Sequence, residues 1–196
     1  MARPLCLDGA SFLLSESDPR RLAACGAEVA FVGRSNAGKS TLLNALCRKD
    51  LARVSGAPGC TRTITVYLAA KDRWLVDLPG YGFACGPAAS RAGWGPMVEG
   101  YLAGRPALRM VFVLVDAKLG PTKLDLLMLR WLQGENLPWR VVATKADQVK
   151  SSRSLAQKLR VAQAAGVQAD DLAWVSSLDG IGVKELRRDV CALLAG

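Results

Sequence analysis

Apolar and polar positions alternate along the chain in blocks that predict strands followed by helices. Five short apolar runs have the length and composition of buried strands: residues 29–32, 74–77, 110–115, 139–143 and 172–175. Four further stretches repeat apolar residues at helical spacing: residues 41–46, 122–133, 152–165 and 183–194. Strands that alternate with amphipathic helices are typical of a mostly parallel sheet with helices on both faces.

One more strand is predicted at residues 63–68, where β-branched residues are frequent. Only a few residues separate it from the apolar run at 74–77, and so short a gap permits only a hairpin. The strand should therefore run antiparallel to its neighbour, which makes six predicted strands. Because nothing in the chain repeats, we expect one domain over residues 1–196, with residues 1–26 packed on it as an N-terminal extension.

The stretch between the first apolar run and the first helix, residues 33–40, matches G-x-x-x-x-G-K-[ST]. A strand, a Gly-rich turn and a helix start direct backbone N–H groups and the positive helix end at one point, which suits a di- or triphosphate. Lys39 would reach the β- and γ-phosphates, and the Ser40 hydroxyl would bind Mg²⁺. The alternative is a chance match in which both glycines are ordinary turn residues and Lys39 is solvated. The residues expected at the phosphates are Gly33, Arg34, Ser35, Asn36, Ala37, Gly38, Lys39 and Ser40.

A phosphate loop beside one antiparallel strand in an otherwise parallel sheet describes the Ras-like P-loop GTPases. We therefore predict this α/β fold, with a mostly parallel six-stranded sheet, one antiparallel strand and helices on both faces, as a single GTP-binding domain. In open α/β sheets the ligand lies beyond the carboxyl ends of the strands, near the topological switch point. Each of the motifs described next follows a predicted strand, on that one edge.

The tetrapeptide Asp77-Leu78-Pro79-Gly80 ends the strand at residues 74–77. An acidic residue at the end of a buried strand has a Walker-B-like role, so Asp77 would hold Mg²⁺ through water. Gly80 can offer its N–H to a γ-phosphate because no side chain is in the way. We expect Leu78 and Pro79 to lie at the nucleotide as well. A plain strand-ending turn is the alternative for this tetrapeptide in isolation.

Thr144-Lys145-Ala146-Asp147 follows the apolar run at residues 139–143. A carboxylate here can accept hydrogen bonds from guanine N1 and N2, a donor pair that adenine lacks. The Lys145 stem would lie along the base plane, and a helix-starting turn capped by Asp147 is the alternative. After the last strand, backbone N–H groups would complete the base pocket at the guanine O6; the residues expected there are Val175, Ser176 and Ser177.

The segment 53–62 is polar and contains Gly and Pro, and it lies where a γ-phosphate-sensing loop belongs. Thr61 is the natural second hydroxyl ligand for Mg²⁺, beside Ser40 and Asp77. We predict a catalytic set of Lys39, Thr61 and Gly80. The residues of this loop expected at the nucleotide are Gly59, Cys60, Thr61, Arg62 and Thr63.

The net charge of +9 is concentrated in two parts of the chain. Residues 48–73 carry six basic and two acidic side chains, and residues 81–110 carry three basic and one acidic. These segments bracket those expected at the γ-phosphate, so a polyanion such as nucleic acid could meet the nucleotide-sensing face. A solvated basic surface is the alternative.

Apolar run lengths and the cysteines indicate in which compartment the protein works and whether it could bind zinc. The apolar run at 110–115 is too short to span a bilayer, and the first 15 residues have no sustained apolar stretch, so we expect neither membrane insertion nor a secretory signal. The six cysteines form no C-x-x-C pair and the chain has no histidine, so a zinc site would need cysteines or carboxylates alone. Free thiols in a reducing cytoplasm are the simpler interpretation.

Residues 29–40, 77–84 and 144–147 resemble the EngB family of bacterial ribosome-biogenesis GTPases, which are Era-like P-loop GTPases. The likeness covers nearly the whole chain, and Tyr81-Gly82-Phe83-Ala84 is its most specific part. That family is implicated in assembly of the large ribosomal subunit. The resemblance therefore implies a partner in this subunit or its precursor, through ribosomal RNA and protein. It also implies a cytoplasmic monomer that uses GTP or GDP with Mg²⁺ and binds no DNA.

The chain departs from the family pattern at residues 58–62, Pro-Gly-Cys-Thr-Arg in place of Pro-Gly-Arg-Thr-Gln. Thr61 is kept, so Mg²⁺ coordination should be kept too, although its neighbours differ. Ras-type enzymes orient the attacking water with a Gln just after D-x-x-G. That position is Tyr81 here, so we expect slow hydrolysis in the isolated protein.

Asn36 suggests a further cofactor, K⁺. Related GTPases with Asn at this place bind K⁺ beside the phosphates, where the ion can act as an arginine finger would. We hypothesise that Asn36 contributes to such a K⁺ site. The alternative is that Asn36 only hydrogen-bonds the loop.

Two functions fit these features. The first is a GTP-gated assembly factor that uses nucleotide state to order residues 49–62 and 80–96 into a surface for ribosomal RNA and protein. The second is a GTP-dependent adaptor whose partner is another protein or an acidic membrane surface. An ATPase or kinase is disfavoured by Asp147, which suits guanine.

Overall fold

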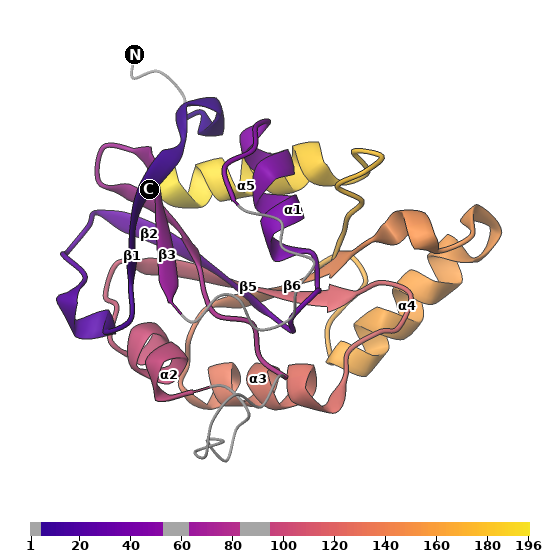
Figure 1. Ribbon diagram of the computed structural model, residues 1–196. Helices are drawn as coiled ribbons and strands as arrows, with labels where there is room; N and C mark the ends of the chain where they lie inside the picture. Colours follow the sequence, from indigo (N-terminus) through magenta and orange to yellow (C-terminus); the bar gives the residue numbers. More distant parts are fainter. Residues whose placement is uncertain (1–4, 53–62, 83–94) are drawn as a thin grey trace.

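The computed structural model describes residues 5–52, 63–82 and 95–196, and these form a seven-stranded sheet with helices on both faces (Figure 1). The strands are β1 (Ser11–Glu16), β2 (Ala27–Gly33), β3 (Ile64–Ala70), β4 (Arg73–Asp77), β5 (Leu108–Asp116), β6 (Trp139–Thr144) and β7 (Ala173–Trp174). The α-helices are α1 (Lys39–Cys47), α2 (Pro96–Ala103), α3 (Lys123–Gly134), α4 (Ser154–Ala165) and α5 (Val183–Ala195). Short 3-10 helices are η1 (Leu7–Gly9), η2 (Pro19–Arg21), η3 (Ala146–Gln148) and η4 (Ser151–Arg153).

The strand order is β1-β3-β4-β2-β5-β6-β7. β3 runs antiparallel to both of its neighbours, β1 and β4, and every other pairing in the sheet is parallel. The predicted hairpin and its single antiparallel strand are therefore confirmed, as is the α/β class. Because the chain leaves β2 for β3 and β4 on one side and then returns to β5 on the other, the switch point lies at the carboxyl end of β2.

The sheet has seven strands where the sequence predicted six. The additional strand, β1, lies at the edge and pairs with β3 from Ser11 opposite Leu68 to Glu16 opposite Ile64. Its side chains are mostly exposed, Phe12 to 60%, and its apolar cluster Phe12-Leu13-Leu14 is shorter than the runs that mark the buried strands. Helix α2 was not predicted either, although Pro96 at its start and the buried Val98 and Tyr101 are helix signals.

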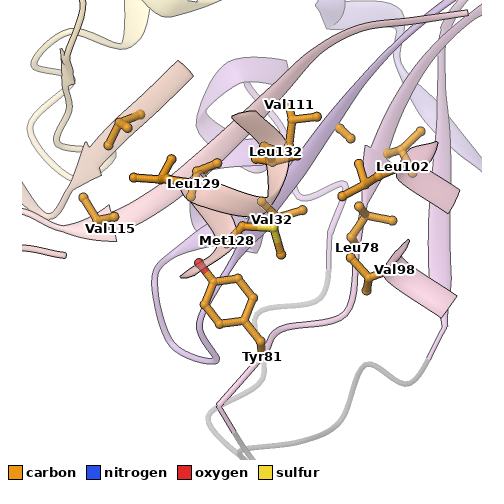
Figure 2. Close-up of a cluster of buried hydrophobic side chains, with 14 of the residues drawn as sticks. Val32, Leu78, Tyr81, Val98, Leu102, Val111, Val115, Met128, Leu129 and Leu132 are labelled. Carbon is orange, nitrogen blue, oxygen red and sulfur yellow. The ribbon is translucent and has the colours of Figure 1, made fainter. Parts of the chain in front are cut away.

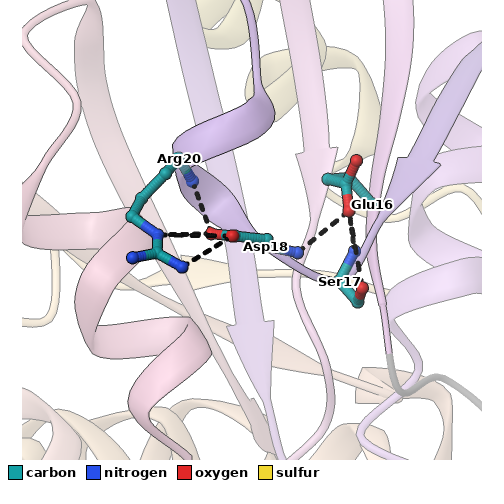
Figure 3. A network of polar contacts seen from close by, with 4 residues as sticks. All are labelled: Glu16, Ser17, Asp18 and Arg20. Carbon is teal, nitrogen blue, oxygen red and sulfur yellow. Dashed lines mark hydrogen bonds and ion pairs between the residues drawn. The ribbon is translucent and has the colours of Figure 1, made fainter.

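A polar network fixes the turn that leads from β1 toward β2 (Figure 3). Glu16 accepts hydrogen bonds from the backbone N–H groups of Ser17 (2.7 Å) and Asp18 (3.0 Å). Asp18 caps η2 by accepting from the Arg20 backbone N–H, and it also accepts from the Arg20 guanidinium. These bonds lower the pKa of Asp18 to about 2, so the cap stays charged over the physiological range.

The core lies in two layers, one on each face of the sheet. Every residue of β2 is buried, and alternate side chains face opposite sides: Val29 and Phe31 pack with α1 and α5, whereas Ala30 and Val32 pack with α2, α3 and α4. Figure 2 shows the second layer, in which Met128, Leu129 and Leu132 of α3 cover β2 and β5. Residues beyond the end of β2 therefore continue from a rigid strand.

The helices of the described segments lack the combination of length and apolarity needed to cross a bilayer.

Candidate nucleotide-binding site

The loop between β2 and α1 has the backbone expected of a phosphate cradle. Gly38 precedes α1 with φ +86°, and Asn36 also has a positive φ, +67°. The Ala37 N–H donates to the Arg34 carbonyl (3.0 Å), which closes the turn. Among the described residues no side chain caps the start of α1, so its first N–H groups remain for an anion.

The segment after β4 packs directly on this loop. The Ser35 N–H donates to the Tyr81 carbonyl (3.1 Å), and the Tyr81 N–H donates to the Gly33 carbonyl (3.2 Å). At Gly80 a Cβ atom would lie 3.0 Å from the Ser35 nitrogen, and at Gly33 it would lie 2.9 Å from the Leu114 carbonyl oxygen. The lack of a side chain therefore lets the segment at Gly80 approach the phosphate loop, and lets Gly33 lie close against β5.

Asp77 presents a buried carboxylate oxygen to this cradle. Its Oδ1 lies 3.6 Å from the Lys39 ammonium, beyond hydrogen-bond length, and has no hydrogen-bond partner among the described residues. Burial raises the pKa of Asp77, and the attraction of Lys39 opposes that shift. A carboxylate oxygen without a hydrogen-bond donor, beside Lys39 at the start of α1, is a hard ligand that Mg²⁺ prefers, directly or through water. These residues fit a Mg²⁺ ion.

The side chain of Tyr81 packs into the layer beneath α3, next to Met128 (Figure 2). It is 3% exposed, and its hydroxyl donates to Asp125 Oδ1 at 2.7 Å. Burial and the neighbouring carboxylate raise the pKa of Tyr81 well above its ordinary value. In this arrangement Tyr81 does not offer its side chain to a water molecule at the phosphates.

Residues 144–147, which we expect at the base, are connected to the phosphate loop by Thr144, whose hydroxyl donates to the Ala37 carbonyl (2.7 Å). The Lys145 ammonium lies 3.0 Å from Asp116 Oδ2. Asp147 Oδ1 accepts from the Ser176 hydroxyl (2.7 Å), which orients the carboxylate that would meet guanine. Motifs from three strand ends thus meet around one site.

The segment after β7 also joins this region, since the Ala146 N–H donates to the Val175 carbonyl (3.0 Å). The Ser176 N–H donates to the Ile181 carbonyl (2.9 Å), so it is already used. Of the two serine N–H groups expected at the guanine O6, only that of Ser177 therefore remains as a candidate donor.

Asp116 is a site residue to which the sequence analysis gave no role. It ends β5, pairs with Lys145 and accepts from the backbone N–H groups of Lys118 (3.0 Å) and Leu119 (3.1 Å). A cavity of about 310 Å³ runs past it from the phosphate loop to Lys145. The available signal was an acidic residue at the carboxyl end of a buried strand, the same signal that identified Asp77.

The structure brings most of the predicted site residues to one edge of the sheet: residues 33–40, 77–80, 144–147 and 175–177. Thr63, the last residue of the predicted γ-phosphate-sensing set, lies just before β3. The other members of that set fall outside the described residues: Gly59, Cys60, Thr61 and Arg62.

Comparisons with known proteins find similar GTP-binding proteins. The family described as "50S ribosome-binding GTPase" matches residues 28–145. The chain is 43% identical to the "Probable GTP-binding protein EngB" of Geobacter sulfurreducens, over 86% of this chain and 82% of that protein. It is 44% identical to the protein of the same name from Thermotoga petrophila, over 85% of this chain and 86% of that protein.

A solved structure supports the fold. The crystal structure of a probable GTP-binding protein engB superposes with a TM-score of 0.67 at 23% identity, covering 86% of this chain and 99% of that one.

Proposed function

Because this chain belongs to the EngB family of GTP-binding proteins, within the ribosome-binding GTPases, we propose that it is a nucleotide-switched assembly factor for the large ribosomal subunit. It acts in the cytoplasm as a monomer, binds GTP or GDP with Mg²⁺ and hydrolyses GTP slowly. The single observation that carries the proposal is the Thr144–Ala37 hydrogen bond, which joins a guanine-type motif to a phosphate loop at one sheet edge.

Each residue has a defined task in this proposal. The N–H groups at the start of α1 and the Lys39 ammonium hold the β- and γ-phosphates, and Asp147 accepts from the guanine N1 and N2. Ser40, Asp77 and Thr61 would hold Mg²⁺, which neutralises charge that develops on the transferred phosphoryl group. Gly80 brings its N–H to the γ-phosphate, where its lack of a side chain permits the approach.

Slow hydrolysis follows from the position of Tyr81. Its hydroxyl is bonded to Asp125 and its ring is buried, so catalysis depends on positioning and charge stabilisation by the loop. A switch needs such a slow intrinsic rate, because the GTP state must persist until a partner is bound.

The test is co-sedimentation of the full chain with purified large ribosomal subunits at several salt concentrations. We expect tighter binding to subunits with a non-hydrolysable GTP analogue than with GDP. In both nucleotide states, added salt should weaken the binding. Equal binding in both nucleotide states would overturn the switch. Failure to bind subunits, together with GTP-dependent capture of another protein or of acidic vesicles, would favour the adaptor function instead.

A further inference from the structure

A basic cleft lies beside residues 144–147 and outside the candidate nucleotide site. It has a volume of about 440 Å³, and its polar and charged lining is Lys118, Gln148, Lys150, Arg153, Gln157 and Arg160. None of the lining residues is acidic. The volume is roughly that of fifteen water molecules in the liquid, enough for phosphate groups and an attached sugar.

The four cations of this cleft have no carboxylate partner in the described segments, and all four are exposed. Some cations outside the cleft have a carboxylate partner, as Arg105 has in Glu28 and Arg140 has in Asp189. Residues 148–160 hold four basic side chains and no acidic one. A concave surface of one charge sign focuses its field and attracts a ligand of the opposite sign.

Hydrogen bonds between its walls fix the shape of the cleft. The Gln157 side-chain amide on α4 donates to the carbonyl oxygens of Ala117 (2.9 Å) and Lys118 (3.1 Å). The Arg153 N–H donates to the Lys150 carbonyl (2.8 Å) and closes η4 between them. The cations therefore project from an ordered scaffold, which reduces the entropy lost on binding.

The cleft adjoins the base side of the nucleotide site. Its wall at Gln148 follows Asp147 directly, and the Ala117 N–H donates to the Thr144 carbonyl (2.8 Å). Neither Lys39 nor the segment 77–80 lines it. A ligand in the cleft would therefore not touch the residues that we expect at the γ-phosphate.

We propose that this cleft binds the phosphate backbone of ribosomal RNA and anchors the protein in both nucleotide states. The inference rests on the proposed ribosomal function and adds a contact site to it. Arginine and lysine are the residues that bind phosphate, and glutamine amides hydrogen-bond phosphate or ribose. The lining lacks the aromatic anchors of protein interfaces, which favours RNA over an acidic protein.

The test compares two triple variants with the same loss of charge. The cleft variant is Lys150→Ala, Arg153→Ala and Arg160→Ala, and the control is Lys71→Ala, Lys184→Ala and Arg188→Ala, all exposed positions outside the cleft. Binding to large subunits, to RNA extracted from them and to anionic vesicles is measured against salt, with GDP and with a GTP analogue.

We expect the cleft variant to bind subunits and RNA about 10- to 100-fold more weakly at 0.1 M salt, with a log–log salt slope shallower by about 2–3. The loss should be the same factor in both nucleotide states, and the control should lose much less. A double variant that retains charge, Arg153→Lys with Arg160→Lys, should keep most of the affinity. Unchanged GDP affinity would verify that the cleft variant is folded.

Several results would overturn the anchor. They are unchanged RNA binding by the folded cleft variant, an equal loss of binding in the control variant, or a loss of binding to vesicles alone. Vesicles are included because Leu155 and Leu159 of α4 are exposed next to the cations and could enter a lipid surface. If subunit binding ignores nucleotide state but still falls in the cleft variant, the proposed switch fails and the anchor stands. If binding depends on GTP but the cleft variant is unaffected, the anchor fails and the switch stands.

Discussion

The Tyr81 hydroxyl donates a 2.7 Å hydrogen bond to Asp125, 44 residues further along the chain. The other oxygen of Asp125 accepts from the Thr122 N–H and hydroxyl, both at 2.7 Å, so the same carboxylate caps α3. Asp125 thus joins the residue after Gly80 to the first turn of α3. Any movement of Tyr81 toward the phosphates must break a buried hydrogen bond.

Replacing Tyr81 by Phe should lower stability without changing the chemistry. The change leaves a buried Asp125 oxygen without this donor, which costs about 1–3 kcal/mol in the free energy of unfolding. Single-turnover GTP hydrolysis should stay within about twofold, because the hydroxyl faces α3. Urea denaturation and rapid-quench hydrolysis measure the two effects. A large change in hydrolysis with unchanged stability would mean that Tyr81 reaches the phosphates.

Asp77→Asn should stabilise the metal-free, nucleotide-free protein at neutral pH. The folded-state pKa of Asp77 is raised by burial, so its charge costs stability once pH rises above the unfolded-state value, and the cost persists at pH 7. The amide removes the charge and with it that cost, so the urea midpoint of unfolding should rise. Urea denaturation in a metal chelator tests this, with the exposed Asp72→Asn as control.

The same Asp77→Asn variant should bind GDP more weakly when Mg²⁺ is present, because the carboxylate expected to hold the ion is gone. The ratio of GDP affinities with and without Mg²⁺ gives the effect. An unchanged ratio would argue against a role for Asp77 at the metal.

Asp147→Asn should exchange guanine preference for xanthine preference. An amide NH₂ cannot accept from the guanine 2-amino group but can donate to the 2-oxo group of xanthine, so GDP affinity should fall by on the order of 10²- to 10³-fold while XDP affinity rises. Competition against a fluorescent nucleotide measures both. The control is Asp179→Asn. Asp179 is nearby and exposed, and it contacts Ser176 through its backbone N–H, which the substitution keeps.

Hydrolysis should be faster in K⁺ than in Na⁺ at matched ionic strength if Asn36 helps to bind K⁺ beside the phosphates. Asn36→Gly should remove the difference, and glycine adopts the +67° φ of this position without strain. Single-turnover rates in the two salts measure the effect. Equal rates in the wild type would exclude the K⁺ site.

Sequence patterns predicted the parts of the fold that are buried on both sides. The runs that became β2, β5 and β6 are continuous and apolar because helices cover both of their faces. The edge strand β1 escaped notice because its side chains face solvent, where composition is not constrained. Helix α2 is only eight residues long, which gives periodicity few positions to repeat.

For the candidate site, sequence spacing was sufficient to select residues 33–40 and 144–147, which the structure brings together at one edge of the sheet. Contacts between distant segments were not predictable: the inward position of Tyr81 depends on Asp125, and the use of the Ser176 N–H depends on Ile181. The basic cleft was also missed. Lys118 and Arg160 meet only in the folded chain, and charges counted over long stretches concealed the acid-free segment 148–160.

The hydroxyl of Thr144 couples the segment expected at the purine to the loop expected at the phosphates. A ligand that occupies only one of these two parts, such as pyrophosphate or guanosine, leaves the other part without contacts. Whole nucleotides should therefore be held more tightly than their two halves would suggest when each is measured alone, and loosening either end should speed the departure of the entire molecule.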